Sequence, residues 1–207
     1  MTYRTVKRIL DVTGSAALLA AGALPMAAVA AAVKLDSPGP AIFRQTRLGL
    51  GGKPFTMYKF RSMQVGAEHT GTGVYSQRGD PRVTRVGAIL RKTSVDELPQ
   101  LVNILKGDMS FIGPRPVLTY HPWPFEEYTD EQKERFSVRP GVTGWAQVNG
   151  RKTAMWPERL KYDVEYARNL SLRFDLRILK RTVGEILSAR DNENEGETVA
   201  ARGSADA

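Results

Sequence analysis

The stretch from Val12 to Val33, VTGSAALLAAGALPMAAVAAAV, contains 22 consecutive residues without a charge. A straight helix of this length would be about 33 Å long, enough to cross the roughly 30 Å hydrocarbon core of a bilayer. Ten of the 22 residues are Ala, however, and Pro25 lies in the middle, where it removes a backbone hydrogen bond and kinks a helix. Three interpretations follow: a cleaved signal peptide, a transmembrane anchor, and a helix that enters the membrane and turns back.

The charges that flank this stretch do not choose among the three interpretations. Basic residues lie both before and after it, so the positive-inside rule gives no orientation across a span. The pieces on either side of Pro25, residues 12–24 and 26–33, are each too short to cross a bilayer alone. If both ends of the stretch remain on the cytoplasmic side, the ambiguity of orientation disappears.

Outside this stretch the composition is that of a folded, basic protein. The 207 residues include 30 Lys and Arg against 22 Asp and Glu, a formal net charge of +8, and no Cys. The absence of Cys excludes a disulfide scaffold, thiol catalysis and Cys-based zinc sites. Residues 44–92 alone hold ten basic and two acidic residues, and this excess indicates anionic partners. Because no nucleic-acid-binding motif is recognised, we expect no nucleic-acid partner.

The rest of the chain predicts an α+β fold that is mainly helical and contains a small β-hairpin. Residues 41–48 and 53–63 are expected to be the two strands, joined by a glycine-rich turn. Alternation along the second strand places Lys59 and Arg61 on one face. The other expected elements are helices over residues 84–92, 94–106 and 129–136, two final helices, and loops over residues 66–79, 110–118 and 139–151.

The last predicted helix carries apolar residues at steps of four and three and basic residues on its other faces. The apolar positions are Leu172, Leu176, Leu179, Val183 and Ile186. This pattern is typical of an amphipathic helix that lies on an anionic membrane surface, and equally of an ordinary packed surface helix. The acidic residues 189–207, rich in Gly and Ala, are expected to form a disordered tail.

An acidic pair, Asp96 and Glu97, begins the segment DELPQL. Ser94 and Glu97 have the spacing of a capping box, so two acids at a helix N-terminus are one explanation of the pair. The basic residues near the pair in sequence are Arg85, Arg91, Lys92 and Arg115. Phosphoryl chemistry needs these residue types: a carboxylate of lowered pKa that attacks phosphorus, a second that holds Mg²⁺, and cations that neutralise phosphate oxygens. The pair is therefore the candidate centre for such chemistry.

Three segments extend this pattern over the chain: YKFRSM at residues 58–63, DELPQL through KGDMSFIGPRP at residues 96–116, and RPGVTGWAQVNGR at residues 139–151. Together they resemble the bacterial monotopic phosphoglycosyl transferases, the small sugar transferases that begin lipid-linked glycan assembly. The resemblance covers about residues 4–188. It implies transfer of a sugar 1-phosphate from a UDP-sugar to undecaprenyl phosphate, with release of UMP.

The resemblance also implies a role for each residue of the acidic pair. Asp96 matches the family's nucleophile, which forms a covalent sugar-phosphate intermediate in a ping-pong reaction with Mg²⁺, and Glu97 matches its metal-binding partner. A rival mechanism is direct transfer in a ternary complex, with both acids binding only Mg²⁺. The residues expected to bind substrate are Lys59, Arg61, Arg91, Arg115, Gln147, Asn149, Arg151 and Asp175. A helix N-cap explains Asp175 equally well.

Family members also carry a re-entrant helix–break–helix with proline at the break. Pro25 fits this pattern, whereas the usual residue before that proline is Ser and this chain has Leu24. Residues 1–35 are then expected to be the re-entrant helix and residues 36–188 the catalytic domain of a monotopic protein at the cytoplasmic face of the bacterial inner membrane. The basic residues within 44–92 are expected to attract UDP-sugar, undecaprenyl phosphate and anionic membrane lipid. The sequence names neither the sugar nor the oligomeric state.

Overall fold

The computed structural model describes residues 2–73, 76, 79–149 and 156–187 of the chain. The structure is mainly helical and contains two small two-stranded sheets. The helices are α1 (Tyr3–Asp36), α2 (Arg85–Thr93), α3 (Gln100–Lys106), α4 (Asp130–Lys133), α5 (Trp145–Asn149), α6 (Trp156–Arg168) and α7 (Leu172–Leu187). The strands are β1 (Ile42–Leu48), β2 (Pro54–Phe60), β3 (Ser110–Ile112) and β4 (Gly141–Thr143). Short 3-10 turns are η1 (Leu50–Gly52), η2 (Ala67–His69), η3 (Val95–Glu97), η4 (Phe125–Glu127) and η5 (Glu134–Ser137).

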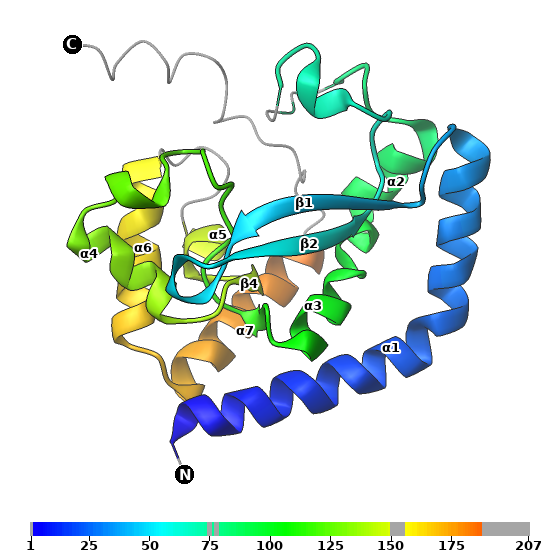
Figure 1. Cartoon of the computed structure of the whole chain (residues 1–207). Helices are drawn as coiled ribbons and strands as arrows, with labels where there is room; N and C mark the ends of the chain where they lie inside the picture. The colour runs from blue at the N-terminus through cyan, green and yellow to red at the C-terminus, as the bar shows by residue number, and fades with distance from the viewer. Residues whose placement is uncertain (1, 74–75, 77–78, 150–155, 188–207) are drawn as a thin grey trace.

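The uncharged N-terminal stretch lies within α1, a single bent helix. The helix runs along one side of the molecule and then changes direction sharply (Figure 1). Pro25 lies inside it, and a proline is the usual cause of such a bend because it removes a backbone hydrogen bond and crowds the preceding turn. The helical assignment nevertheless continues from Tyr3 to Asp36. The break expected between two helices is therefore a kink within one helix.

Polar contacts attach the first half of α1 to the rest of the molecule. Arg8 donates hydrogen bonds to the carbonyl oxygens of Ile104, at 2.6 Å, and Leu105, at 3.0 Å, in the last turn of α3. The buried carboxylate of Asp11 accepts hydrogen bonds from the hydroxyl and the backbone N–H at the start of β3, Ser110 Oγ and Phe111 N, both at 3.0 Å. These contacts fix the helix against α3 and β3, the two elements that follow the acidic pair in the chain.

The predicted hairpin is confirmed. β1 and β2 pair antiparallel, with Gln45 opposite Met57 and Arg47 opposite Phe55. Paired residues point to the same face of a hairpin, so the first strand adds Gln45 and Arg47 to the face that carries Lys59. The buried side chain of Asn103 in α3 forms hydrogen bonds with the backbone of β2. Its amide oxygen accepts from the Tyr58 N–H at 3.0 Å. Its amide also donates to the Thr56 carbonyl oxygen at 2.7 Å.

Two expectations about local structure are wrong. Residues 94–106 form η3 and α3 rather than one helix, because Ser94 adopts a left-handed conformation (φ 57°) that ends α2. The capping box of Ser94 and Glu97 therefore does not form. The expected loops over residues 110–118 and 139–151 contain β3, β4 and α5, with Ser110 paired in parallel to Gly141. A Cβ atom on Gly113 would lie 2.2 Å from the Arg139 carbonyl oxygen, so this crossing of two backbones needs glycine.

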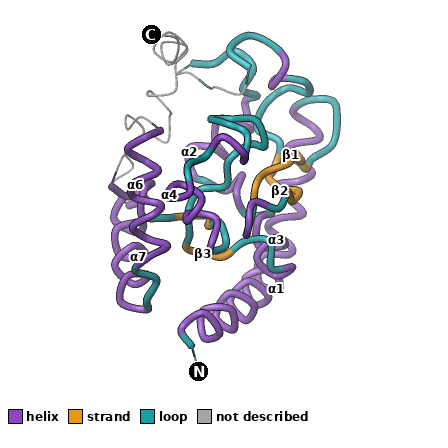
Figure 2. The backbone as a smooth tube through the Cα atoms, turned by 60° about the vertical axis from the view of Figure 1, so that its left-hand side comes forward, coloured by secondary structure: helices purple, strands orange, loops and turns teal. Residues whose placement is uncertain are grey.

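The remaining helices agree with expectation. α2 begins after Thr84, whose side chain accepts from the Gly87 N–H, and the capping box of Thr129 and Gln132 begins α4. β3 lies between the α6–α7 pair and the α1–α3 pair (Figure 2). The hydrophobic core on the α6–α7 side contains Ile112, Trp145, Tyr166, Phe174 and Ile178. The small sheet of β3 and β4 thus lies between these two pairs of helices. The acidic pair lies on the side of the hairpin, because η3 packs against β2.

Substitution of Gly87 with Ala is expected to destabilise the protein. Its Cβ atom would lie 2.0 Å from the Ser62 carbonyl oxygen, so α2 would have to move away from the chain that follows β2. Overpacking of this kind costs about 1–3 kcal/mol in free energy of unfolding. Gly184→Ala is the matched control, because Gly184 is exposed in α7 and a Cβ atom there would have no contact within 4 Å. Thermal unfolding in detergent should show a lower Tm for Gly87→Ala alone.

Candidate active site

The acidic pair lies in η3, the single turn between α2 and α3. Because Ser94 turns the chain with a left-handed conformation, η3 packs against both α2 and β2. Asp96 is buried, with 9% of its surface exposed. Glu97 faces Lys59 of the hairpin, and the Lys59 Nζ atom lies 2.8 Å from the Glu97 Oε1 atom. Residues 38 positions apart in sequence thus meet at one site.

Within the part of the chain that the structure describes, three polar side chains lie beside the Glu97 carboxylate. Besides Lys59, the Gln100 amide donates to Glu97 Oε2 at 2.7 Å, and Arg115 Nη1 lies 3.9 Å from Oε1. A pocket opens beside this carboxylate, and its lining combines the hairpin, η3, α3 and the loop after β3. The lining residues are Arg47, Met57, Lys59, Glu97, Gln100, Arg115, Pro116 and Gly141.

The two adjacent carboxyl groups differ in their affinity for protons. Burial raises the pKa of the Asp96 carboxyl above its usual range, although Lys59 and Arg91 act in the opposite direction. The lowered pKa expected of an attacking carboxylate is therefore not found at Asp96. Burial would also raise the pKa of Glu97, but Lys59, Arg115 and two hydrogen bonds outweigh it and lower that pKa to about 2. Glu97 is therefore ionised at neutral pH, while Asp96 is the more basic carboxylate of the two. Neighbouring acids separated in this way are typical of catalytic sites.

A divalent cation fits this site only where the substrate also supplies ligands to it. Among the described residues, no group of three or more His, Asp or Glu side chains could hold a metal ion by itself. Mg²⁺ is often bound by one or two carboxylates and completed by substrate phosphates and water. Each Glu97 oxygen accepts one short hydrogen bond, and a carboxylate oxygen has two lone pairs, so Glu97 retains the capacity to bind one cation.

Arg61 was expected to bind substrate, and the structure places its side chain at the end of α1. The guanidinium is buried, with 4% of the residue exposed. It donates to the Pro40 carbonyl oxygen at 2.7 Å and to the carbonyl oxygen and hydroxyl of Ser37 at 2.8 and 2.6 Å. These contacts give Arg61 a structural position, where it holds the chain as it leaves α1.

Asp175 is likewise distant from the pocket lining and buried between helices. Its carboxylate accepts hydrogen bonds from Tyr3 at 2.5 Å and Tyr166 at 2.7 Å, and Lys7 Nζ lies 2.6 Å away. Burial and the Asp175 carboxylate together raise the pKa of Tyr166 far above its usual value. Asp175 therefore joins α1, α6 and α7.

Four other residues were expected to bind substrate, and the structure describes three of them. The Gln147 amide donates to the Val142 carbonyl oxygen at 2.9 Å, and the Asn149 amide donates to the Trp145 carbonyl oxygen at 2.8 Å. Arg91 Nη2 donates to Ser76 Oγ at 2.8 Å. The Arg91 charge also opposes the rise in the pKa of the Asp96 carboxyl. Arg151 lies outside the described residues. The structure thus brings Lys59, Glu97 and Arg115 together beside Asp96, and the substrate contacts of all the expected residues stay predictions.

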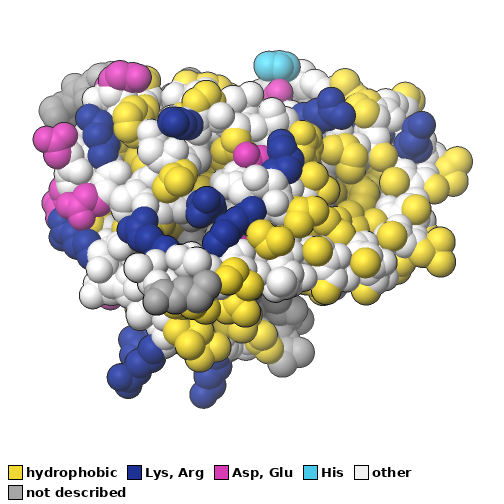
Figure 3. Space-filling model, turned by 60° about the horizontal axis from the view of Figure 1, so that its bottom comes forward, with side chains coloured by type: hydrophobic (Ala, Val, Ile, Leu, Met, Phe, Trp, Pro, Cys, Tyr) yellow, Lys and Arg dark blue, Asp and Glu magenta, His cyan; other side chains and the backbone are white. Residues whose placement is uncertain are grey.

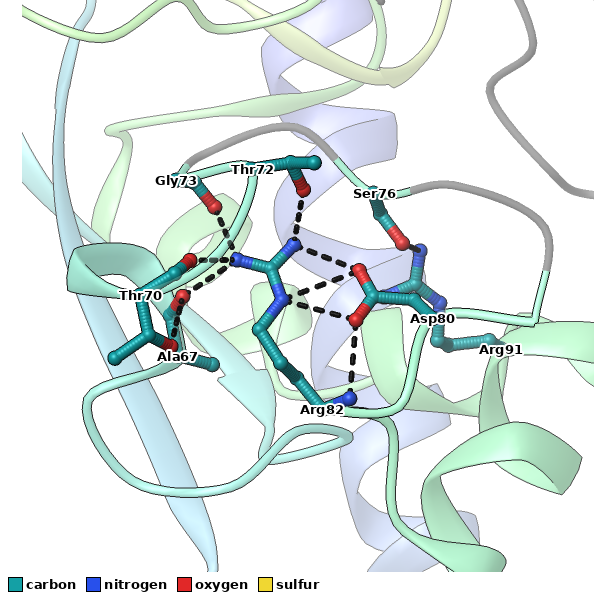
Figure 4. Close-up of polar contacts among 8 residues, drawn as sticks. All are labelled: Ala67, Thr70, Thr72, Gly73, Ser76, Asp80, Arg82 and Arg91. Atoms are coloured by element: carbon teal, nitrogen blue, oxygen red, sulfur yellow. Dashed lines mark hydrogen bonds and ion pairs between the residues drawn. The ribbon is translucent and has the colours of Figure 1, made fainter.

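Sequence reasoning missed Arg82, which organises the loop after the hairpin. Its guanidinium donates to the carbonyl oxygens of Ala67, Thr70 and Gly73 at 2.6–2.7 Å, and Nη2 lies 2.7 Å from Asp80 Oδ2. Figure 4 shows these contacts converging on one side chain, beside the contact of Arg91 with Ser76. The loop expected over residues 66–79 is therefore held together by hydrogen bonds in its described part. Gln45 and Arg47 were also missed, although pairing the two predicted strands would have placed them beside Lys59.

Comparison with known proteins identifies the family. The family model described as bacterial sugar transferase matches residues 2–189. The chain is 47% identical to the UDP-glucose:undecaprenyl-phosphate glucose-1-phosphate transferase of Caulobacter vibrioides over 187 residues, which are 88% of this chain and 70% of that relative. The protein of the same name in Escherichia coli (strain K12) is 43% identical, over 87% of this chain and 40% of its own length.

A third relative carries a different sugar in its name. The UDP-N-acetylgalactosamine-undecaprenyl-phosphate N-acetylgalactosaminephosphotransferase of Aeromonas hydrophila is 42% identical, over 90% of this chain and 44% of its own length. The chain thus spans less than half of two of these three relatives. The family match covers both the bent helix and the acidic pair, and the protein therefore belongs to the bacterial sugar transferase family.

Proposed function

We propose that this protein transfers a sugar 1-phosphate from a UDP-sugar to undecaprenyl phosphate and releases UMP. The observation that carries the proposal is the buried Asp96 next to an ionised Glu97, which lines a pocket together with Lys59 and Arg115. Substrates of this class place several anionic phosphate oxygens around the reacting phosphorus, and cations beside a carboxylate suit such chemistry. Relatives named for glucose and for N-acetylgalactosamine transfer support the reaction class and leave the sugar open.

Asp96 is proposed to act as the nucleophile. One of its carboxylate oxygens attacks the phosphorus that carries the sugar, and the bond from that phosphorus to the oxygen of the departing UMP breaks. A phosphate oxygen of undecaprenyl phosphate then attacks the same phosphorus and frees the Asp96 carboxylate, giving undecaprenyl diphosphate bearing the sugar. The raised pKa of Asp96 supports this role, because the ionised form of a weaker acid is a better nucleophile.

The neighbouring residues are proposed to stabilise charge. Glu97 is the residue that would hold Mg²⁺, and the bound cation would supply neutralisation of phosphate oxygens. Lys59 keeps Glu97 ionised and, with Arg115, places positive charge where the phosphate oxygens arrive. In the rival mechanism, direct transfer in a ternary complex, both acids bind only the cation and no bond to Asp96 forms.

The exposed apolar surface of α1 and α7 supports an association of the proposed enzyme with a membrane. α1 is long and apolar enough to cross a membrane by length and composition, and only 6% of its most apolar window is buried in the structure. The predicted apolar face of α7 is exposed, with Leu172, Leu176, Leu179 and Val183 each 47–56% exposed. Figure 3 shows hydrophobic side chains in a broad area on the right of the view, the side on which α1 bends in Figure 1, with Lys and Arg beside them. This surface is typical of a protein that contacts an anionic membrane.

We further propose that α1 is re-entrant, so that both of its ends and the catalytic domain lie at the cytoplasmic face of the bacterial inner membrane. The bend within α1 supports this arrangement (Figure 1). The chain has no Cys, so single cysteines can report topology. Thr2→Cys and His69→Cys are expected to resist a membrane-impermeant maleimide in spheroplasts and to react after lysis. Labelling of Thr2→Cys alone in intact spheroplasts would indicate a spanning helix instead.

The proposed reaction is tested by measuring UMP release from a panel of UDP-sugars. Purified protein in detergent with Mg²⁺ and undecaprenyl phosphate should release UMP from at least one UDP-sugar and form the matching undecaprenyl diphosphate product, detected by mass spectrometry. Failure to release UMP from any member of a panel that includes UDP-glucose and UDP-N-acetylgalactosamine would contradict the proposal.

A further inference from the structure

The pocket contains a third cation, Arg47, that comes from the first strand of the hairpin. Pairing in the hairpin places Gln45 and Arg47 on the same face as Met57 and Lys59. Both Arg47 and Lys59 line the pocket together with Glu97 and Arg115. The lining therefore includes three cationic side chains and one carboxylate, and this excess favours an anionic ligand.

The orientation of the Arg47 guanidinium is fixed by neutral oxygen atoms. Nε donates to Gln45 Oε1 at 3.0 Å, and Nη2 donates to the same amide oxygen. Nη1 donates to the Pro116 carbonyl oxygen at 3.1 Å, directly after Arg115. These contacts to an amide oxygen and a carbonyl oxygen orient the guanidinium at the pocket.

Gln45 is itself held by the loop that follows the hairpin. Its amide nitrogen donates to Glu68 Oε2 at 2.9 Å, in η2. A carboxylate only accepts hydrogen bonds, so this contact turns the amide nitrogen toward Glu68 and the amide oxygen toward Arg47. Arg82 fixes the same loop by its contacts with the Ala67 and Thr70 carbonyl oxygens, which Figure 4 shows. A chain of hydrogen bonds thus runs from the loop to the pocket.

We propose that Arg47 binds the diphosphate of the UDP-sugar, and that Gln45 and Glu68 are positioning residues for it. This inference rests on the proposed function. Lys59 is engaged with Glu97 at 2.8 Å, and a nucleoside diphosphate brings more than one anionic group into the pocket. A guanidinium suits the second group because its planar N–H donors match the oxygens of a phosphate.

The test is the affinity for UDP, the part common to every UDP-sugar, measured by calorimetry with Mg²⁺. Arg47→Gln is expected to bind UDP about 10- to 100-fold more weakly than the unsubstituted protein, as for loss of a charged hydrogen bond. Arg47→Lys should recover part of that loss and shows that the site still folds. Arg44→Gln is the matched control, since Arg44 is exposed on the same strand and lies over the Tyr58 ring on the opposite face of the hairpin; its UDP affinity should be unchanged.

Kinetic measurements separate the positioning role of Gln45 from direct binding of the diphosphate by Arg47. They also show which substrate's phosphate Arg47 contacts, that of the UDP-sugar or that of undecaprenyl phosphate. Gln45→Leu should raise the KM for the UDP-sugar several-fold with kcat retained, and Arg47→Gln should leave the KM for undecaprenyl phosphate unchanged. Unaltered UDP affinity in Arg47→Gln, or a rise confined to the KM for undecaprenyl phosphate, would overturn the inference while leaving the proposed reaction intact. Failure of the unsubstituted protein to bind UDP would contradict both.

Discussion

Replacing Asp96 with Asn is expected to lower the rate of UMP release roughly 1,000-fold or more, because the amide keeps the shape of the carboxyl group but is a poor nucleophile. Asp96 is buried beside Lys59 and Glu97, so the substitution removes a reacting group with little change in volume. UMP release measured with a coupled nucleotide assay reports the first half of the proposed reaction. A near-normal rate in Asp96→Asn would show that another group attacks phosphorus.

Two further measurements separate the covalent route from direct transfer. With UDP-sugar and no undecaprenyl phosphate, the covalent route predicts a stoichiometric burst of UMP and a mass increase of one sugar phosphate on Asp96, detected on the intact protein. Glu97→Gln is the matched control, since it alters the neighbouring carboxylate of η3 and leaves Asp96 in place. It should lower the rate strongly yet still allow the adduct to accumulate slowly. UMP release that depends strictly on undecaprenyl phosphate would favour the ternary complex.

The elements that could be predicted from the sequence are those built by local patterns. The hairpin followed from alternation and glycine, and the helices expected over residues 84–92 and 129–136 followed from local helical patterns. The strands β3 and β4 were missed because each has three residues and is defined by its partner about 30 positions away. Ser94 was misread because its left-handed conformation depends on how α2 meets η3, which residue spacing does not show.

Part of the candidate site could also be predicted from the sequence, because local motifs contain its residues. Asp96, Glu97, Lys59 and Arg115 belong to motifs whose residue types match one chemistry, and the structure brings these four side chains together. Residue type alone does not tell an arginine that binds phosphate from one that binds carbonyl oxygens. Arg61 contacts the end of α1, 24 residues earlier in the chain, and only the fold shows that contact.

Loss of the buried ion pair between Arg135 and Asp163 is expected to have the largest effect on stability. Arg135 Nη2 lies 2.8 Å from Asp163 Oδ2, and each residue is 2% exposed. Asp163→Asn would leave the Arg135 charge buried without its counter-ion, which costs about 3–5 kcal/mol in free energy of unfolding. Chemical denaturation in detergent measures the loss. Glu134→Gln is the control: it breaks an exposed pair with Arg168 at 2.7 Å, and surface pairs contribute little.

A double substitution separates what this ion pair contributes to the stability of the protein from what it contributes to the position of Arg115 at the pocket. Arg135 Nη2 also donates to the Arg115 carbonyl oxygen at 2.8 Å, so the ion pair holds the backbone of a residue that lines the pocket. Arg135→Met with Asp163→Leu removes both charges and should recover much of the stability lost in Asp163→Asn. Because Arg115 would still lose its donor, we expect the rate of UMP release to remain well below that of the unsubstituted protein. Recovery of stability and rate together would show that the pair contributes to folding alone.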